Sequence, residues 1–455
     1  MRVGWTLNLL LFSLIFVVFC SALPVHATSM WDFQTVDALV VRGGCSVALD
    51  SHNNPHITYS RYTSDDRGNA TLKYAWRNGS AWDIQTVDPL MDNGGGSSIK
   101  IDSNGYPHIS YCDYDYTYWD SIGVELKYAR WNGSGWSIQI VDKHVWGGSS
   151  MALDPANNPH ICYSDKAGNL KYANLAGSIW SIQTLDSGKI RSGQSLVLDN
   201  NNNPHIVYSN NNLIYAYWNG SNWSFQKVAS GDADNSFQYS FALDFNGYPN
   251  ISYLRQTGGT LCYTHWNGTT WDIQIPDPAR IVGGGVGDGN SLALDSNNIP
   301  HLSYFAYDYN AGNELKYARW NGSAWIIQTL PYQEHLSFGF TFMVIDSNNN
   351  PQIGYFTNPS GGWRPVGNLN YGQLRIHTNT FPITDDSRVF IIECYSHFGS
   401  NHCTVHIRSK KKETKHKQLE LAKLKKEICL FTGFLFSVLL RRCCCRLGRL
   451  ARSCR

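Results

Sequence analysis

The stretch Ser291–Leu330 reads SLALDSNNIPHLSYFAYDYNAGNELKYARWNGSAWIIQTL and contains four short segments rich in apolar, β-branched and aromatic residues. These segments are SLALD, HLSY, LKYARW and WIIQTL, and their four to six residues match the usual length of a β-strand. DSNNIP separates the first two segments, and NGSA separates the last two. The stretch therefore predicts a unit of four strands joined by tight turns.

The same pattern occurs seven times along the chain. An Asp is followed five residues later by a Pro, and four residues after that by a Tyr. The seven Asp are Asp50, Asp102, Asp154, Asp199, Asp244, Asp295 and Asp346. A Trp that opens the fourth segment also recurs, as Trp31, Trp82, Trp136, Trp180, Trp223, Trp271 and Trp325. A period of roughly 40–50 residues with four strands per unit is typical of a propeller blade, and rings close with roughly 4–8 blades. We therefore predict an all-β fold, a seven-bladed β-propeller of four-stranded antiparallel blades.

The phase of the repeats predicts how the ring closes. Trp31–Asp37 precedes every other strand segment, whereas the last copy, from Thr341 onward, has no Trp segment after Tyr371. We expect the N-terminal strand to complete the last blade, because this leaves no open sheet edge. The propeller would then span residues 28–376.

The first 27 residues have the pattern of a secretory signal. Arg2 supplies a positive start, Leu9–Phe19 is apolar, and Ala27 ends a small-residue cleavage site. A lipoprotein signal at Cys20 is the alternative, although Phe19 stands where that signal needs a small residue. We therefore expect a secreted or cell-surface protein.

Export agrees with eight Asn-x-Ser/Thr sequons in the repeat region, which are suited to glycosylation at exposed turns. They begin at Asn69, Asn78, Asn132, Asn219, Asn222, Asn250, Asn267 and Asn321. Asn-Gly also supplies the positive φ of a tight hairpin, so the turn itself is the simpler reason for most of these residues.

Residues 377–455 leave the repeat pattern. Fifteen Lys and Arg against three Glu give residues 408–455 a net charge of +12, so the total of +2 leaves −10 for the rest of the chain. Ile428–Leu440 is apolar but shorter than the roughly 17–25 residues of a membrane span. We expect a basic, Cys-containing tail that is poorly ordered or weakly helical, or not native coding sequence. The alternative is a membrane-surface anchor, since a basic flank beside an apolar segment suits anionic lipid.

The predicted blades divide the loops between two faces. The first-to-second and third-to-fourth strand turns share one face and are nearly identical in every copy; we call it the constant face. The second-to-third and fourth-to-first connections share the other, the variable face, and differ from copy to copy. Binding residues usually lie on variable loops held by a rigid scaffold, so we predict the ligand site there.

The richest loop of the variable face is Cys112–Gly123, CDYDYTYWDSIG. Its candidate ligand-binding residues are Asp113, Tyr114, Asp115, Tyr116, Tyr118, Trp119 and Asp120, and the sixth copy adds Tyr307, Asp308 and Tyr309. Tyr and Trp offer an apolar face with a polar edge and Asp accepts hydrogen bonds, which suits a sugar or a peptide. The alternative is that these aromatic rings pack over neighbouring blades. Further candidates on this face are Arg61, Asp65, Asp66, Arg67, Arg255, Trp363 and Arg364.

The segments nearest the predicted axis combine Gly-rich loops with a Ser four residues before the repeat Asp. These serines are Ser46, Ser98, Ser150, Ser195, Ser240 and Ser291. Close approach of the inner strands explains them better than ligand binding. Lys100 is a further candidate, because the matching positions hold only Ala or Val and a lone cation there would point into the channel.

Five histidines follow the repeat Pro, at His56, His108, His160, His205 and His301. One residue per blade is spread round a ring, so hydrogen bonding to the neighbouring turn explains them better than a metal site does. DSNNNP has too few carboxylates for a calcium loop. A zinc site in the tail would need Cys394, His397, His402, Cys403 and His406. We expect no metal and no cofactor.

Tyr317–Trp325, YARWNGSAW, resembles the Trp-(Asp/Asn)-Gly-x-x-Trp hairpins of fucose-type propeller lectins, and the repeat style is similar to sialidase-like propellers. The resemblance covers about Trp31–Ile376 and identifies the fold better than an activity.

The sialidase Asp-box, Ser-x-Asp-x-Gly-x-x-Trp, is not matched. A sialidase-type mechanism also needs a Tyr nucleophile with a Glu partner, and only Glu125, Glu314 and Glu334 precede residue 377. We therefore predict a non-catalytic binding propeller for a glycan or a cell-surface protein, without a nucleic-acid partner. The alternatives are a sialidase-like glycoside hydrolase and a structural adhesion protein.

Overall fold

The computed structural model forms two compact units, Met30–Arg375 and the two ends of the chain, Met1–Ser29 with Ile376–Arg455. It describes residues 29–62, 70–91, 94–113, 124–188, 190, 193–230, 239–255, 259–278, 289–308, 312–330, 341–357, 367–376, 381–385, 388–396 and 403–409. The predicted signal peptide and residues 410–455 lie outside this part of the chain.

The described strands of the first unit form seven antiparallel blades, as predicted. Blade 1 holds the end of β1 (Ser29–Leu49) with β2 (Pro55–Tyr62), β3 (Ala70–Asn78) and β4 (Ala81–Met91). Blade 2 holds β5 (Gly94–Ile101), β6 (Pro107–Asp113), β7 (Glu125–Trp131) and β8 (Trp136–Lys143). Blade 3 holds β9 (Val145–Leu153), β10 (Pro159–Asp165), β11 (Asn169–Ala176) and β12 (Ile179–Ser187). Blade 4 holds β13 (Ser195–Leu198), β14 (Pro204–Ser209), β15 (Asn212–Trp218) and β16 (Trp223–Ser230).

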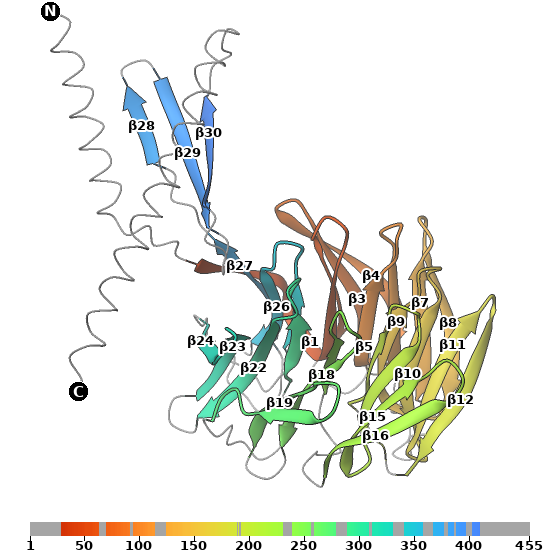
Figure 1. The fold of residues 1–455 in the computed structure, drawn as a ribbon. Helices are drawn as coiled ribbons and strands as arrows, with labels where there is room; N and C mark the ends of the chain where they lie inside the picture. The colour runs from red at the N-terminus through yellow and green to blue at the C-terminus, as the bar shows by residue number, and fades with distance from the viewer. Residues whose placement is uncertain are drawn as a thin grey trace, which may run out of the picture. The chain divides into compact units, whose positions relative to one another are not determined.

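Blade 5 holds β17 (Ser240–Leu243), β18 (Pro249–Arg255), β19 (Thr260–Trp266) and β20 (Trp271–Gln274). Blade 6 holds β21 (Ser291–Leu294), β22 (Pro300–Asp308), β23 (Gly312–Trp320) and β24 (Trp325–Thr329). Blade 7 holds β25 (Phe342–Ile345), β26 (Pro351–Thr357), β27 (Gly367–Ile376) and the start of β1. In Figure 1 the blades follow one another in chain order, from β3 and β4 in orange through β12 in yellow to β22 and β23 in green.

The ring closes through the N-terminal strand, which confirms the prediction. β1 lies between β27 and β2, so blades 7 and 1 share one continuous seven-stranded sheet. The indole of Trp31, near the start of β1, contacts the ring of Tyr317 in blade 6 with centroids 5.5 Å apart. The Thr35 hydroxyl lies 3.1 Å from Oδ1 of Asn370 on β27. The start of β1 therefore acts as the outer strand of blade 7.

The repeat Trp joins each blade to the one before it. Every repeat Trp packs at a steep angle on a third-strand Tyr of the preceding blade, with centroids 5.2 to 5.8 Å apart. Such edge-to-face pairs are each worth about 0.5–1.5 kcal/mol beyond their buried area. In five blades the indole N–H also donates to a Gln of the preceding outer strand, as from Trp325 to Gln274 at 2.9 Å.

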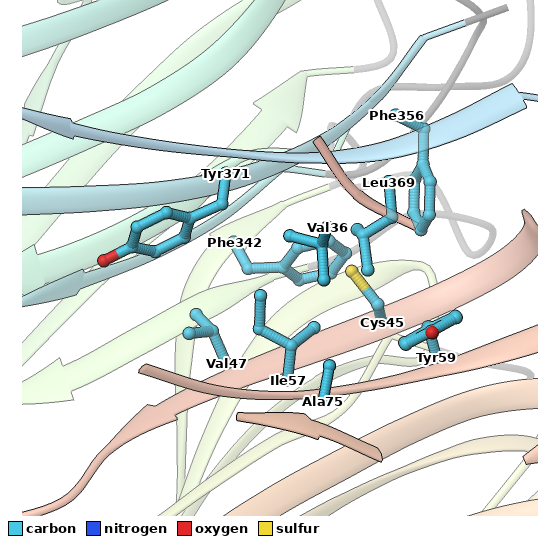
Figure 2. Packing of buried hydrophobic residues seen from close by; sticks show 10 residues of the cluster. All are labelled: Val36, Cys45, Val47, Ile57, Tyr59, Ala75, Phe342, Phe356, Leu369 and Tyr371. Atoms are coloured by element: carbon cyan, nitrogen blue, oxygen red, sulfur yellow. The ribbon is translucent and has the colours of Figure 1, made fainter. Parts of the chain in front are cut away.

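The hydrophobic core lies between neighbouring sheets. Figure 2 shows one such cluster, in which Val36 and Cys45 of β1 lie near Phe342 and Leu369 of blade 7. Six further clusters of described residues fill the other blade junctions. Four buried free cysteines belong to these clusters, at Cys45, Cys112, Cys162 and Cys262. They act as small core residues, in agreement with their irregular places in the repeat.

The second unit contains a three-stranded antiparallel sheet of β28 (Phe381–Asp385), β29 (Arg388–Ser396) and β30 (Cys403–Ser409). No helix with the length and apolarity needed to cross a membrane occurs among the described residues of either unit.

Candidate functional site

The constant face is built from tight turns around the repeat Asp. In each of the seven copies, Oδ1 of the Asp accepts the backbone N–H four residues later. The third residue after the Asp has a positive φ and is an Asn or a Gly, as at Asn298 (59°) and Gly105 (81°). Tyr106 follows this position, and its hydroxyl lies against Gly133 of the third-to-fourth strand hairpin. The two short turns thus lie side by side on one face, as predicted.

These turns are also bonded from blade to blade. The Asn with positive φ reaches back to the residue after the repeat Asp in the preceding blade. Asn53 bonds Ser347, Asn157 bonds Ser103, Asn298 bonds Phe245 and Asn349 bonds Ser296. Blades 2 and 5 have Gly at this position and lack the amide. The polar groups of the constant face are therefore largely used to hold the ring together.

The repeat histidines belong to buried networks. In each of the five, Nδ1 lies 2.5 to 2.6 Å from the hydroxyl of a third-strand Tyr. Nε2 faces Oδ2 of the repeat Asp at 3.4 to 3.8 Å. Burial lowers the pKa of all five histidines, to about 4 for His108. The arrangement agrees with hydrogen bonding to the neighbouring turn as their role.

The serines near the axis join inner strands of successive blades. The hydroxyls of Ser46, Ser98, Ser150, Ser240 and Ser291 each accept a backbone N–H from the inner strand of the next blade, at 2.8 to 3.3 Å. This supports the interpretation that these residues allow the inner strands to approach closely.

Lys100 lies on the inner strand β5 and has an exposed side chain. Desolvation by the surrounding protein nevertheless lowers its pKa. The place of Lys100 in the channel as a ligand-binding cation stays a prediction.

At the variable face, polar side chains gather where two blades meet. An Asp that ends the outer strand of one blade accepts a hydrogen bond from the second-strand Tyr of the next. The pairs are Asp37–Tyr59, Asp88–Tyr111, Asp142–Tyr163, Asp186–Tyr208 and Asp277–Tyr304, at 2.6 to 2.9 Å. We call each junction a seam and name it by its blades, so that Asp37 and Tyr59 belong to the 7/1 seam.

The side chains around this pair differ from seam to seam. In the 1/2 seam, Nζ of Lys127 lies 2.7 Å from Asp113 and 3.4 Å from Asp88. Burial opposes the charge of Lys127, but the two carboxylates outweigh it and raise the pKa. The candidate Asp113 is thus held in an ion pair between two strands. Lys316 of the 5/6 seam similarly lies 3.1 Å from Asp277 and 3.5 Å from Glu314.

The candidates Arg61 and Arg255 occupy equivalent places, two residues after the second-strand Tyr. Arg61 lies 3.7 Å from Asp37 in the 7/1 seam, and its side chain is 34% exposed. In the 4/5 seam Ala229 stands where five of the other six blades have the outer-strand Asp. Burial raises the pKa of Tyr253 there, and the nearby charge of Arg255 lowers it in part.

Several predicted residues lie outside the described part of the chain. These are Tyr114, Asp115, Tyr116, Tyr118, Trp119, Asp120, Tyr309, Trp363 and Arg364, with Asp65, Asp66 and Arg67. The side chains of Tyr307 and Asp308 are also outside it, although their backbone pairs within blade 6. The Cys112–Gly123 loop therefore stays a prediction.

Sequence reasoning missed the seams. Two signals would have found them: an Asp recurs six residues after the repeat Trp, and a Lys often precedes the third-strand Tyr. Only the ring brings these two positions together, because they belong to successive blades.

No protein-family model and no curated protein matches this chain. Among solved structures it is similar to the BP39L lectin from Burkholderia pseudomallei, with 11% identity and a TM-score of 0.48 over 74% of this chain and 98% of that one. A fucose-specific lectin from Aleuria aurantia has 14% identity and a TM-score of 0.42, covering 66% and 97%. An intramolecular trans-sialidase from Ruminococcus gnavus has 9% identity and a TM-score of 0.39, covering 74% and 94%. Two of these structures are thus lectins and one is a trans-sialidase, and at these identities and TM-scores the similarity says nothing of this chain's function.

Proposed function

We propose that this chain is a non-catalytic carbohydrate-binding propeller that acts outside the cell or at its surface. The observation that carries the proposal is the different placement of repeated and variable polar side chains. Those that repeat in each blade are used in bonds within and between blades. Those that differ between blades lie at the variable-face seams, at the ends of rigid strands.

The seams offer suitable chemistry for a sugar. Lys, Arg and Tyr donate hydrogen bonds and carboxylates accept them, so that together they match the hydroxyls of a saccharide. The resemblance of the Trp-Asn-Gly hairpins to those of fucose-type lectins supports carbohydrate as the ligand class. The aromatic residues predicted in the Cys112–Gly123 loop would add stacking surface beside the 1/2 seam.

The second-strand tyrosines favour binding over a sialidase-like reaction. Tyr304 donates a hydrogen bond to Asp277, and Glu314 lies in the same seam. Burial raises the pKa of Tyr304, and Asp277 raises it further. The raised pKa keeps this hydroxyl protonated, and the nearest base, Asp277, is already paired with Lys316 at 3.1 Å, so Tyr304 is a poor nucleophile.

The test is a glycan array probed with the full chain, with turnover of a fluorogenic sialoside measured in parallel. We expect binding to at least one class of glycan, and at least a tenfold loss in the variant Trp119→Ala, as for removal of a stacking residue. The control Ile179→Ala removes a side chain that is 74% exposed on an outer strand and should bind like wild type. Turnover would favour the hydrolase. The absence of both binding and turnover would favour an adhesion protein.

A further inference from the structure

The 7/1 seam differs in charge from the other seams that contain a third-strand Lys. Arg61 and Lys73 both lie there with the single carboxylate of Asp37. Among the described side chains of this seam, two cations thus face one anion. We propose that the 7/1 seam binds the anionic group, a carboxylate or a sulfate, of an acidic glycan; this inference rests on the proposed function.

Strand register places both cations on the same side of blade 1. Tyr59 and Arg61 are two residues apart on β2 and therefore point to the same face of the sheet. Lys73 on β3 is paired directly with Tyr59, so Lys73 and Arg61 are diagonal neighbours on that face. Diagonal neighbours are about 7–8 Å apart, within reach of long side chains. The face they share is turned toward blade 7, since Tyr59 donates to Asp37 of β1.

The equivalent diagonal pairs in the next two blades have opposite charges. Asp113 occupies the place of Arg61 in blade 2 and lies 2.7 Å from Lys127. Asp165 occupies it in blade 3 and lies 3.6 Å from Lys171. In blade 1 the Lys instead faces an Arg, and its Nζ donates to the neutral hydroxyl of Thr86 at 2.7 Å.

The electrostatic consequence is visible at Lys73. Burial lowers its pKa, Arg61 lowers it further, and Asp37 only partly opposes them. Lys127, which has two carboxylates, has a raised pKa instead. Like charges held together in a partly desolvated place are unfavourable unless an anion joins them. A ligand carboxylate or sulfate would supply that anion, and the planar guanidinium of Arg61 can bind either through two parallel hydrogen bonds.

The experiment measures binding of three probes to the full chain: a sulfated heparin oligosaccharide, a galacturonic acid oligomer and a neutral N-acetylglucosamine oligomer. Arg61→Asp recreates the natural Asp–Lys pair of blades 2 and 3, so this variant should fold. We expect wild type to prefer one acidic probe, and the variant to bind that probe about tenfold more weakly, as for loss of one charge-assisted contact. The acidic probe that wild type prefers shows whether the site favours a sulfate or a carboxylate.

Two further variants sharpen the result. Lys73→Gln removes the second cation and should also weaken binding of the acidic probe. Lys143→Gln is the control, because it removes one positive charge from a side chain that is 62% exposed and paired with Glu125. Binding that falls equally in all three variants would show only a general effect of net charge and overturn the proposal.

The outcomes separate this inference from the proposed function. Wild type that binds the neutral oligomer as tightly as the acidic probes overturns the anion site, while carbohydrate binding stands. If no glycan binds, a rise in melting temperature with inorganic sulfate that Arg61→Asp abolishes keeps the anion site, and carbohydrate binding fails. Without either response, both proposals fail.

Discussion

At the scale of single residues, the constant-face turns show how one side chain decides a contact between blades. The left-handed position of the turn holds Asn in five blades, and in four of them its amide bonds the preceding blade. The exception is Asn202, because the residue after the repeat Asp in the preceding blade is Pro155, which has no N–H to donate. Blades 2 and 5 hold Gly105 and Gly247 instead, at φ of 81° and 77°. The turn survives because Gly adopts this conformation freely.

Gly105→Asn should therefore stabilise the ring. Asn tolerates a left-handed φ, a Cβ at this position meets nothing within 4 Å, and the new amide would reach the turn at Ser51. We expect the free energy of unfolding, measured in urea, to exceed that of wild type by about 0.5–1 kcal/mol, as for one added hydrogen bond. Gly105→Ala is the matched control and should lose about 1 kcal/mol, because Ala has the strain without the bond. Equal stability of the two variants would contradict this account.

At the scale of elements, the sheet shared by blades 7 and 1 shows a local compensation. Gly372 stands after the third-strand Tyr of blade 7, where five other blades have Ala. A Cβ on Gly372 would lie 2.5 Å from Cε1 of Phe33 on β1. Phe33 itself packs against Trp31 and Tyr355, with centroids 6.0 and 5.9 Å away. Gly372 therefore leaves room for the Phe33 ring in the orientation that it adopts here.

Gly372→Ala should weaken ring closure. The added methyl must displace the Phe33 ring, so we expect a loss of roughly 1–3 kcal/mol in the free energy of unfolding, typical of overpacking. The double variant Phe33→Ile with Gly372→Ala should recover most of it, because Ile faces Ala in blade 1, as Ile84 and Ala75. A double-mutant cycle by urea unfolding measures the recovery. Additive losses would show that the two residues are not coupled.

The seams contain contacts that the repeat pattern of the sequence does not predict. Asp, Pro, Tyr and Trp at fixed spacing were enough to predict seven blades, two faces and closure by the first strand, because each repeat must form the same unit. The ion pair of Lys127 depends on Asp88, which lies 39 residues away in another blade, and on the diagonal register that brings Asp113 within reach. Contacts between copies of a repeat do not show in the pattern of one copy.

The whole molecule carries five copies of the Asp–His–Tyr network, one each in blades 1, 2, 3, 4 and 6, so protonation acts on five blades together. The folded-state pKa of each His is below its unfolded value of about 6.5. Between these two values the unfolded chain binds more protons than the folded one, so stability falls as the pH falls below about 6.5. The repeat Asp, whose bonds outweigh burial and lower its pKa, adds a second loss below about pH 4, where the unfolded chain takes up protons first.

We therefore expect the urea midpoint to be level from pH 8 to 7 and to fall steadily from pH 6.5 to 4.5. His108→Gln should make this fall shallower, because unfolding would then take up about one proton fewer in this range. The reason is that the pKa of His108 is about 4 in the folded protein. Gln is chosen because Gln352 fills this place in blade 7 and accepts a hydrogen bond from Tyr371. A midpoint that stays constant down to pH 4.5 would rule out the neutral, buried histidines.

The strand that belongs to two blades also sets an order of events on the ribosome. Trp31–Asp37 leaves the ribosome before the other strand segments of the propeller, whereas its partner β27 begins only at Gly367. At about 5–20 residues per second, the opening strand waits roughly a quarter of a minute to a minute for its partner. Throughout that interval its Trp and Val side chains are open to chaperones, so blade 7 is the last blade to be finished, however early its first strand is made.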